Sequence, residues 1–174
     1  MDPLLAISFK SFSSIWYWIM TGIAWSMTCH WTLGVPYDAL VRAHSRGGEA
    51  ARDAEALAHL NIRRVVGWFS SGASIVVAVV AFFLAICATF GFAYGYELAQ
   101  AIFMLVLPLT IVQILNVRLA FHIHNVGLDG EDLRKALVRR RFWNQVIGLF
   151  SILCAALMAF LQFAPDVVLW FTGW

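Results

Sequence analysis

Charged side chains are scarce in this sequence of 174 residues. Asp, Glu, Lys and Arg together make up only 13% of it, and the formal net charge is +2. An ordinary soluble domain carries about twice that share of charged residues, so a soluble enzyme domain and a disordered tail are both excluded. The small net charge argues against a nucleic-acid-binding protein. Because 61% of the residues are hydrophobic, a membrane protein is the class that remains.

Motifs that carry chemistry are also lacking. The three cysteines lie far apart and form no Cys-x-x-Cys pair, which argues against an iron–sulfur cluster or a redox dithiol. The sequence has no Gly-x-Ser-x-Gly and no His-Glu-x-x-His, the signatures of common hydrolases and metalloproteases. We therefore expect no enzymatic activity, no bound cofactor and no metal site.

Four stretches contain no charged residue at all, and they cover residues 11–37, 65–96, 98–117 and 142–165. A transmembrane helix needs about 20 residues to cross a hydrocarbon layer of about 30 Å, so each stretch holds one crossing. The sequence therefore predicts an all-α, polytopic membrane protein with a single membrane domain, built as a four-transmembrane-helix bundle. We place its spans at about 14–33, 65–94, 98–121 and 142–164.

The basic residues set the expected orientation. Eleven of the twelve Lys and Arg residues fall between the first and second spans or between the last turn of the third span and the fourth, and only Lys10 falls on the other side. The positive-inside rule then makes residues 34–64 and 122–141 cytoplasmic loops, with the N- and C-termini outside. We expect short amphipathic cytoplasmic helices in the first loop, and a helical hairpin whose first helix ends at Gly127 in the second.

Small residues recur at spacings of four and three along the second span, and a similar row runs along the fourth. Such rows let two helix backbones approach closely, which is how helices associate in lipid. Two arrangements remain open: the second span packs against the fourth within one chain, or it contacts another chain. The predicted helix-packing residues are Gly67, Ser71, Ser74, Ala78, Ala81, Ala85 and Ala88 in the second span, and Gly148, Ser151, Ala155 and Ala159 in the fourth.

Polar residues inside the predicted spans are few. Gln113 and Asn116 share one face of the third span, and Pro108 leaves a backbone carbonyl one turn earlier without its usual donor. We expect hydrogen bonds between helices here, each worth about 0.6 to 2 kcal/mol. A quinone or ion site is the alternative interpretation of these residues.

Two of the five histidines could serve as haem ligands. His30 lies near the inner end of the first span and His122 near that of the third. The charge boundaries offset them in depth by about 10 Å at 1.5 Å per residue, which disfavours a haem held between them. His122 and His124 lie two residues apart, the wrong spacing for a zinc-binding pair on one helix face.

The N-terminal part carries a distinctive pattern of aromatic residues. Residues 11–19 read SFSSIWYWI, and Trp25, the pair His30-Trp31 and the segment LGVPYDALVRA at residues 33–43 follow. Over residues 11–43 the chain resembles a family of short alphaproteobacterial inner-membrane proteins often labelled "component of SufBCD complex". The resemblance implies a multi-pass protein of the bacterial inner (cytoplasmic) membrane, and the label implies a link to iron–sulfur assembly, but it supplies no catalytic motif.

These observations favour a non-catalytic accessory or assembly subunit whose partners are other integral-membrane subunits and lipid, with an energy-transducing complex as one candidate setting. One alternative is a haem- or quinone-binding electron-transfer subunit that uses His30 and His122. Another is an oligomeric pore formed by the second span, and a homo-oligomer is compatible with each interpretation.

Overall fold

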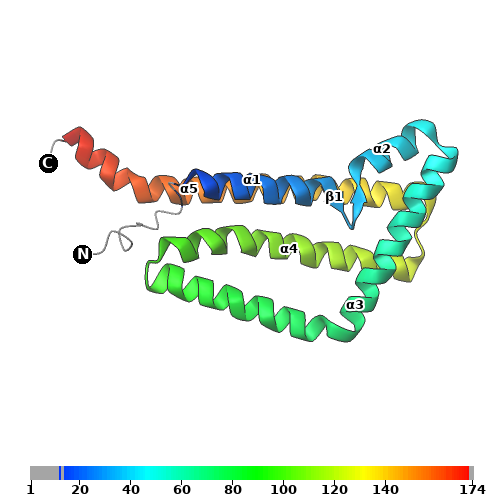
Figure 1. The fold of residues 1–174 in the computed structure, drawn as a ribbon, viewed down its shortest axis with the longest axis horizontal. Helices are drawn as coiled ribbons and strands as arrows, with labels where there is room; N and C mark the ends of the chain where they lie inside the picture. Colours follow the sequence, from blue (N-terminus) through cyan, green and yellow to red (C-terminus); the bar gives the residue numbers. More distant parts are fainter. Residues whose placement is uncertain (1–11, 13, 173–174) are drawn as a thin grey trace.

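The computed structural model describes residue 12 and residues 14–172, with side chains up to residue 162. Nearly all of this part of the chain is helical (Figure 1). The elements in order are α1 (Ile15–His30), β1 (Trp31–Thr32), β2 (Val35–Pro36), α2 (Tyr37–Arg46), α3 (Gly48–Ala88), the π-helical turn η1 (Thr89–Ala93), α4 (Glu97–Val126) and α5 (Gly130–Thr172).

Three helices in the described residues are long and apolar enough to cross a membrane. They are α3 together with η1, α4, and α5 up to Gln162. The prediction of a membrane protein is confirmed to that extent, and these helices contain the predicted second, third and fourth spans. The predicted first span corresponds to α1, which has 16 residues and rises only about 24 Å. Four crossings and the orientation of the termini therefore stay predictions.

The first helix ends earlier than predicted. We expected it to continue to Leu33, but α1 ends at His30 and a small antiparallel hairpin pairs Trp31 with Pro36. Leu33 and Gly34 form its two-residue turn with φ values of 51° and 75°, the left-handed conformation that tight hairpins use. Leu33 is nevertheless buried, so packing of its side chain compensates for the strained backbone.

Helix α3 is continuous where a loop and a separate helix were predicted. It runs unbroken from Gly48 through residue 65, where the second span was expected to begin, to Ala88. Figure 1 shows a sharp bend partway along α3, after which the helix runs beside α4. The segment from Gly67 to Gly72 is rich in Gly and Ser, and Ser70 Oγ donates to the carbonyl of Gly67 at 2.9 Å. Such residues are a usual cause of helix bending.

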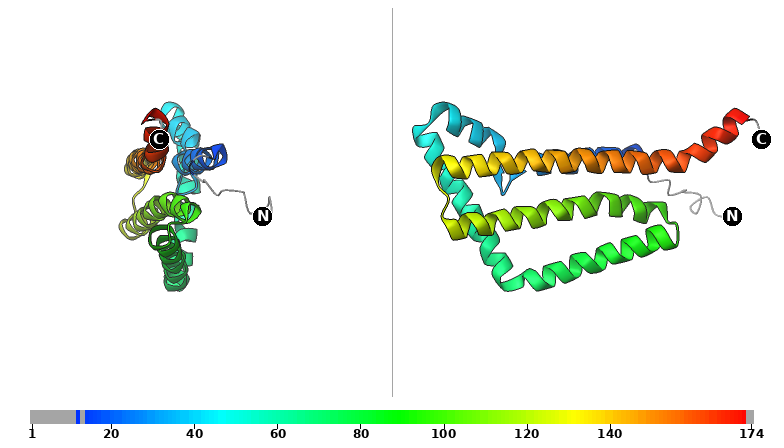
Figure 2. Two further views of the ribbon diagram at one scale, coloured as in Figure 1. Left: turned by 90° about the vertical axis from the view of Figure 1, so that its left-hand side faces the viewer. Right: turned by 180° about the vertical axis from the view of Figure 1, so that it is seen from behind.

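The helices form layers. Helix α4 lies between α3 on one side and the pair α1 and α5 on the other (Figure 2). The main hydrophobic core lies where the hairpin and α2 meet the first part of α3, the end of α4 and the start of α5. Its buried residues are Leu33, Val35, Leu40, Ala58, Ile62, Ala120, Ile123, Leu133 and Leu137. This core holds the end of the molecule that carries most of the charged residues.

At the opposite end of α4, a chain of amide hydrogen bonds joins three elements. Gln162 of α5 donates to the side chain of Gln100 in α4, and Gln100 in turn donates to the carbonyl of Gly91 in η1 at 2.7 Å. A Cβ at Gly91 would lie 3.0 Å from the backbone nitrogen of Gln100. Glycine at this position therefore allows η1 and α4 to approach closely.

Candidate functional site

The small residues of α5 pack inside the molecule. Gly148, Ser151, Ala155 and Ala159 are all buried. A Cβ at Gly148 would lie 2.6 Å from Cε3 of Trp25 in α1, so the indole ring sits directly on the glycine backbone. Ser151 reaches α4, and Ala159 packs with Phe12 and Ala101. The small residues of α5 thus pack against α1 and α4.

The small residues of α3 lie on an exposed surface instead. Gly67, Ser71, Ser74, Ala78, Ala81 and Ala85 are exposed, and Ala88 is partly exposed. After its bend, α3 runs beside α4 rather than α5 (Figure 1), because α4 lies between them. The arrangement in which the two rows pack against each other within one chain is therefore not the one adopted. Contact of the α3 row with another chain stays a prediction.

Pro108 of α4 creates the free carbonyl that the sequence indicates. The proline has no N–H to donate to the carbonyl of Met104, four residues earlier. Ser151 Oγ of α5 donates to this carbonyl at 3.4 Å. A buried serine on one helix thus compensates for a proline on its neighbour.

Replacement of this serine tests the compensation. Because hydrogen bonds between membrane helices average about 0.6 kcal/mol, we expect Ser151→Ala to lower the free energy of unfolding by about 0.6 to 1 kcal/mol. Pro108→Ala supplies a backbone donor to Met104, so the serine should contribute less in that background. Unfolding of the four variants in mixed detergent micelles measures both effects, and equal losses in the two backgrounds would contradict the pairing.

The two polar residues of the third span have different surroundings. Gln113 is exposed, whereas Asn116 is buried and its Oδ1 accepts a hydrogen bond from Arg140 Nε of α5 at 2.9 Å. Arg140 also donates to the carbonyl of Val112 at 3.4 Å. One turn further along α5, Asn144 is fully buried and has no hydrogen-bond partner among the described residues. From the sequence we expected Arg140 in the loop between the third and fourth spans and did not expect a buried polar residue at Asn144.

The two candidate haem ligands are both exposed. The ring of His30 packs edge to face against Trp31, with centroids 5.8 Å apart. His122 projects from the surface of α4 near its end. Neither imidazole is enclosed by the protein as a haem ligand would be, so the electron-transfer interpretation gains no support from the geometry.

A cluster that the sequence analysis did not identify lies where α3 meets the turn between α4 and α5. Glu55 and His59 occupy one face of α3, four residues apart, and Asp129 lies in the turn. One ligand atom from each residue lies within 4.8 Å of the other two. His59 Nε2 lies 2.8 Å from Asp129 Oδ1, and Glu55 Oε1 accepts the backbone N–H of Gly130 at 2.8 Å. The spacing of Glu55 and His59 was the available signal, but the sequence does not place Asp129 beside them.

Two further ion pairs lie on α2 and in the first turns of α5. Arg134 holds the pKa of Glu131 down at about 2, and Arg42 lowers the pKa of Asp38. Both carboxylates are therefore ionised at neutral pH. A small cavity of about 130 Å³ lies between α2, α3 and the start of α5, lined mainly by alanine and leucine together with Glu55, Glu131 and Arg134.

Comparisons with known proteins identify no similar protein. No family model, no curated protein and no solved structure matches this chain. The resemblance over residues 11–43 therefore stays a prediction.

Proposed function

We propose that this chain is a non-catalytic membrane subunit that binds another integral-membrane chain through the small-residue row of α3. The observation that carries the proposal is the exposure of this row, from Gly67 to Ala85. The corresponding row on α5 is covered by α1 and α4, so the same pattern is already used for close packing elsewhere in the chain. Small residues let backbones approach closely where burial of apolar surface in lipid supplies no driving force.

The membrane part of α3 also makes few contacts of its own. Among residues 67–90, Cys87 is the one buried residue. A helix that completes its packing within one chain buries at least a stripe of its surface. Most of the circumference of this helix is therefore free to contact a partner helix or lipid.

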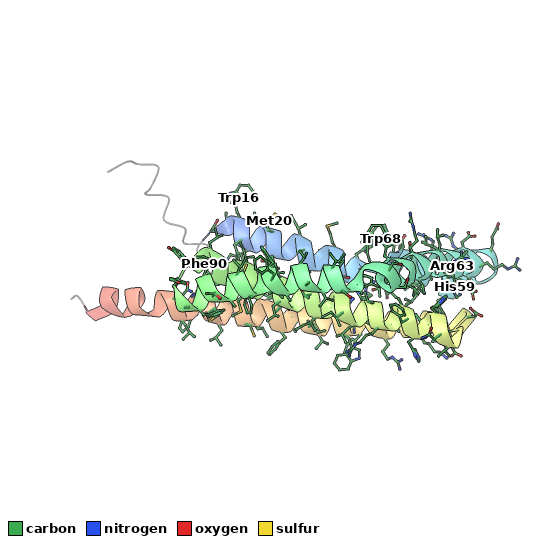
Figure 3. The ribbon with its side chains drawn as sticks, turned by 90° about the horizontal axis from the view of Figure 1, so that it is seen from below. Trp16, Met20, His59, Arg63, Trp68 and Phe90 are labelled. Carbon is green, nitrogen blue, oxygen red and sulfur yellow. The ribbon has the colours of Figure 1, made fainter. Side chains whose placement is uncertain are left out.

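The same proposal includes four membrane crossings with both termini outside. Helix α1 lies alongside the apolar part of α5, as Gly148 and Trp25 show. Its outer face is apolar, and Trp16 and Met20 point away from the bundle (Figure 3). Eleven of twelve basic residues lie beyond one end of the spans, which supports a cytoplasmic location for α2 and the α4–α5 turn in a bacterial inner membrane.

Enlargement of one residue in the exposed row tests the function. We expect Ala81→Leu to reduce the share of tagged chain that migrates in a larger complex by about tenfold, equivalent to about 1.4 kcal/mol. The reason is that a bulky side chain in the row separates the two helix backbones. Native electrophoresis of membranes extracted in mild detergent measures the share, and two differently tagged copies show whether the partner is a second copy.

Val79→Leu is the matched control, because Val79 is exposed but lies on the opposite face of α3 from Ala81. We expect it to leave the complex intact. A wild-type chain that migrates only as a monomer, or equal losses in the two variants, would overturn the proposal. Conductance that changes with Ala81→Leu in planar bilayers would favour the pore instead.

A further inference from the structure

We propose that Glu55, His59 and Asp129 form a binding site for a divalent transition-metal ion, specifically zinc. This site is independent of the helix-packing surface, because it lies at the charged end of the molecule rather than along the membrane part of α3. Figure 3 shows His59 at that end, together with Arg63. Three ligand atoms that lie within 4.8 Å of one another come from two segments far apart in the sequence.

The ligand set favours zinc over calcium or magnesium. Calcium and magnesium prefer sites built from oxygen atoms alone, whereas zinc accepts an imidazole nitrogen together with carboxylate oxygens. Three protein ligands leave a fourth tetrahedral position for water. Asp129 is largely exposed, so solvent can reach that position.

The distance between His59 and Asp129 is close to the one that zinc needs, and Glu55 lies within 4.8 Å of both. With metal–ligand bonds of about 2.0 to 2.1 Å, two tetrahedral ligand atoms lie about 3.3 Å apart. His59 Nε2 and Asp129 Oδ1 lie 2.8 Å apart, so they need to separate by only about half an ångström. A zinc ion would replace the proton that joins them now.

The backbone around the cluster positions two of its ligands. Gly130 donates its N–H to Glu55 Oε1 at 2.8 Å, which orients the carboxylate and leaves its second oxygen for a metal. Gly127 and Gly130 adopt φ values of 69° and 55° on either side of Asp129. These left-handed residues fold the turn back so that Asp129 faces α3. A bound ion would therefore clamp the α4–α5 turn to α3.

Zinc binding to the full-length chain in detergent tests the site directly. After removal of metal with a chelator, we expect the chain to bind one zinc ion in competition with a chromophoric zinc indicator. Loss of groups that merely support zinc ligands costs about 10- to 100-fold in affinity, so His59→Ala and Asp129→Asn should each cost at least about tenfold. Asp129→Asn preserves the shape of the turn and separates loss of binding from loss of fold, which circular dichroism monitors.

Two neighbouring residues supply matched controls. Glu131→Gln removes a carboxylate two residues from Asp129, and His124→Ala removes an exposed imidazole near the end of α4. We expect both to bind zinc as the wild type does. Absence of saturable binding, unchanged binding in His59→Ala, or equal losses in His59→Ala and His124→Ala would each overturn the site. Zinc held by the cysteines would give the second of these results.

Discussion

Gly148→Leu is expected to destabilise the packing of α1 on α5 strongly. A Cβ at this position would lie 2.6 Å from Cε3 of Trp25, closer than Cβ atoms approach other atoms in proteins, and 3.0 Å from its Cδ2. Leucine adds three further heavy atoms to that Cβ. Overpacking usually costs about 1 to 3 kcal/mol, and occasionally more, so we expect a loss of about 3 kcal/mol in the free energy of unfolding. Reversible unfolding in mixed micelles measures it.

Gly22→Leu is the matched control for this change. Gly22 lies on α1, and nothing lies within 4 Å of the position that its Cβ would occupy. There we expect no loss, because a glycine in a helix interior costs about 1 kcal/mol relative to a better helix former. Trp25→Ala combined with Gly148→Leu should recover part of the loss. Equal effects of Gly148→Leu and Gly22→Leu would show that Trp25 does not pack on the glycine.

The two rows of small residues show what the sequence can and cannot predict. The spacing correctly indicates helices, and the row on α5 does pack closely, whereas close packing of the row on α3 stays a prediction. The pattern does not specify the partner, because many different side chains can pack against a helix surface made of small residues. The partner of Gly148 is Trp25, an aromatic residue 123 positions earlier. Only the three-dimensional arrangement of the layers brings the two together.

The local signal at the end of the third span was more informative than the boundaries between charged and apolar segments. Gly127 ends α4 in the left-handed conformation that its position predicts. By contrast, the first charged residue does not mark the end of a helix. Helix α3 continues across this boundary because the stretch from Gly48 to Val66 forms helix as readily as the apolar stretch that follows. Packing of Ala58 and Ile62 in the main core then holds the extension.

Long side chains also make the boundary between the charged and apolar parts of α5 hard to place. Arg140 follows the rule that arginine marks the membrane edge, but its guanidinium reaches back to Asn116 in α4. The flexible stem of arginine allows this, because it can pack along apolar surface while its charged group finds a polar partner. The spacing in the sequence gives no indication of such a contact between residues 24 positions apart.

Asn116→Leu should therefore be the second strongly destabilising change. It removes the acceptor of the 2.9 Å hydrogen bond from Arg140 Nε and leaves only the 3.4 Å contact with the carbonyl of Val112. A hydrogen bond to a charged group contributes about 1.5 to 3 kcal/mol. A half-buried cation that loses its partner also destabilises the folded state, because its desolvation is no longer compensated. We expect a loss of about 2 to 3 kcal/mol in the free energy of unfolding.

The double variant Asn116→Leu with Arg140→Met separates the lost bond from the change in packing. With the cation gone, leucine faces methionine, and an apolar pair of similar volume is often as stable as the polar pair it replaces. We therefore expect the double variant to be more stable than Asn116→Leu alone by about 2 kcal/mol, which gives a strong coupling in the double-mutant cycle.

Gln113→Leu is the control, because Gln113 lies on the same helix but is exposed. Its replacement should change the free energy of unfolding little. If Asn116→Leu alone and the double variant with Arg140→Met were equally stable, the asparagine would serve only to fill space. The contact between Arg140 and Asn116 would then not help to join α4 and α5.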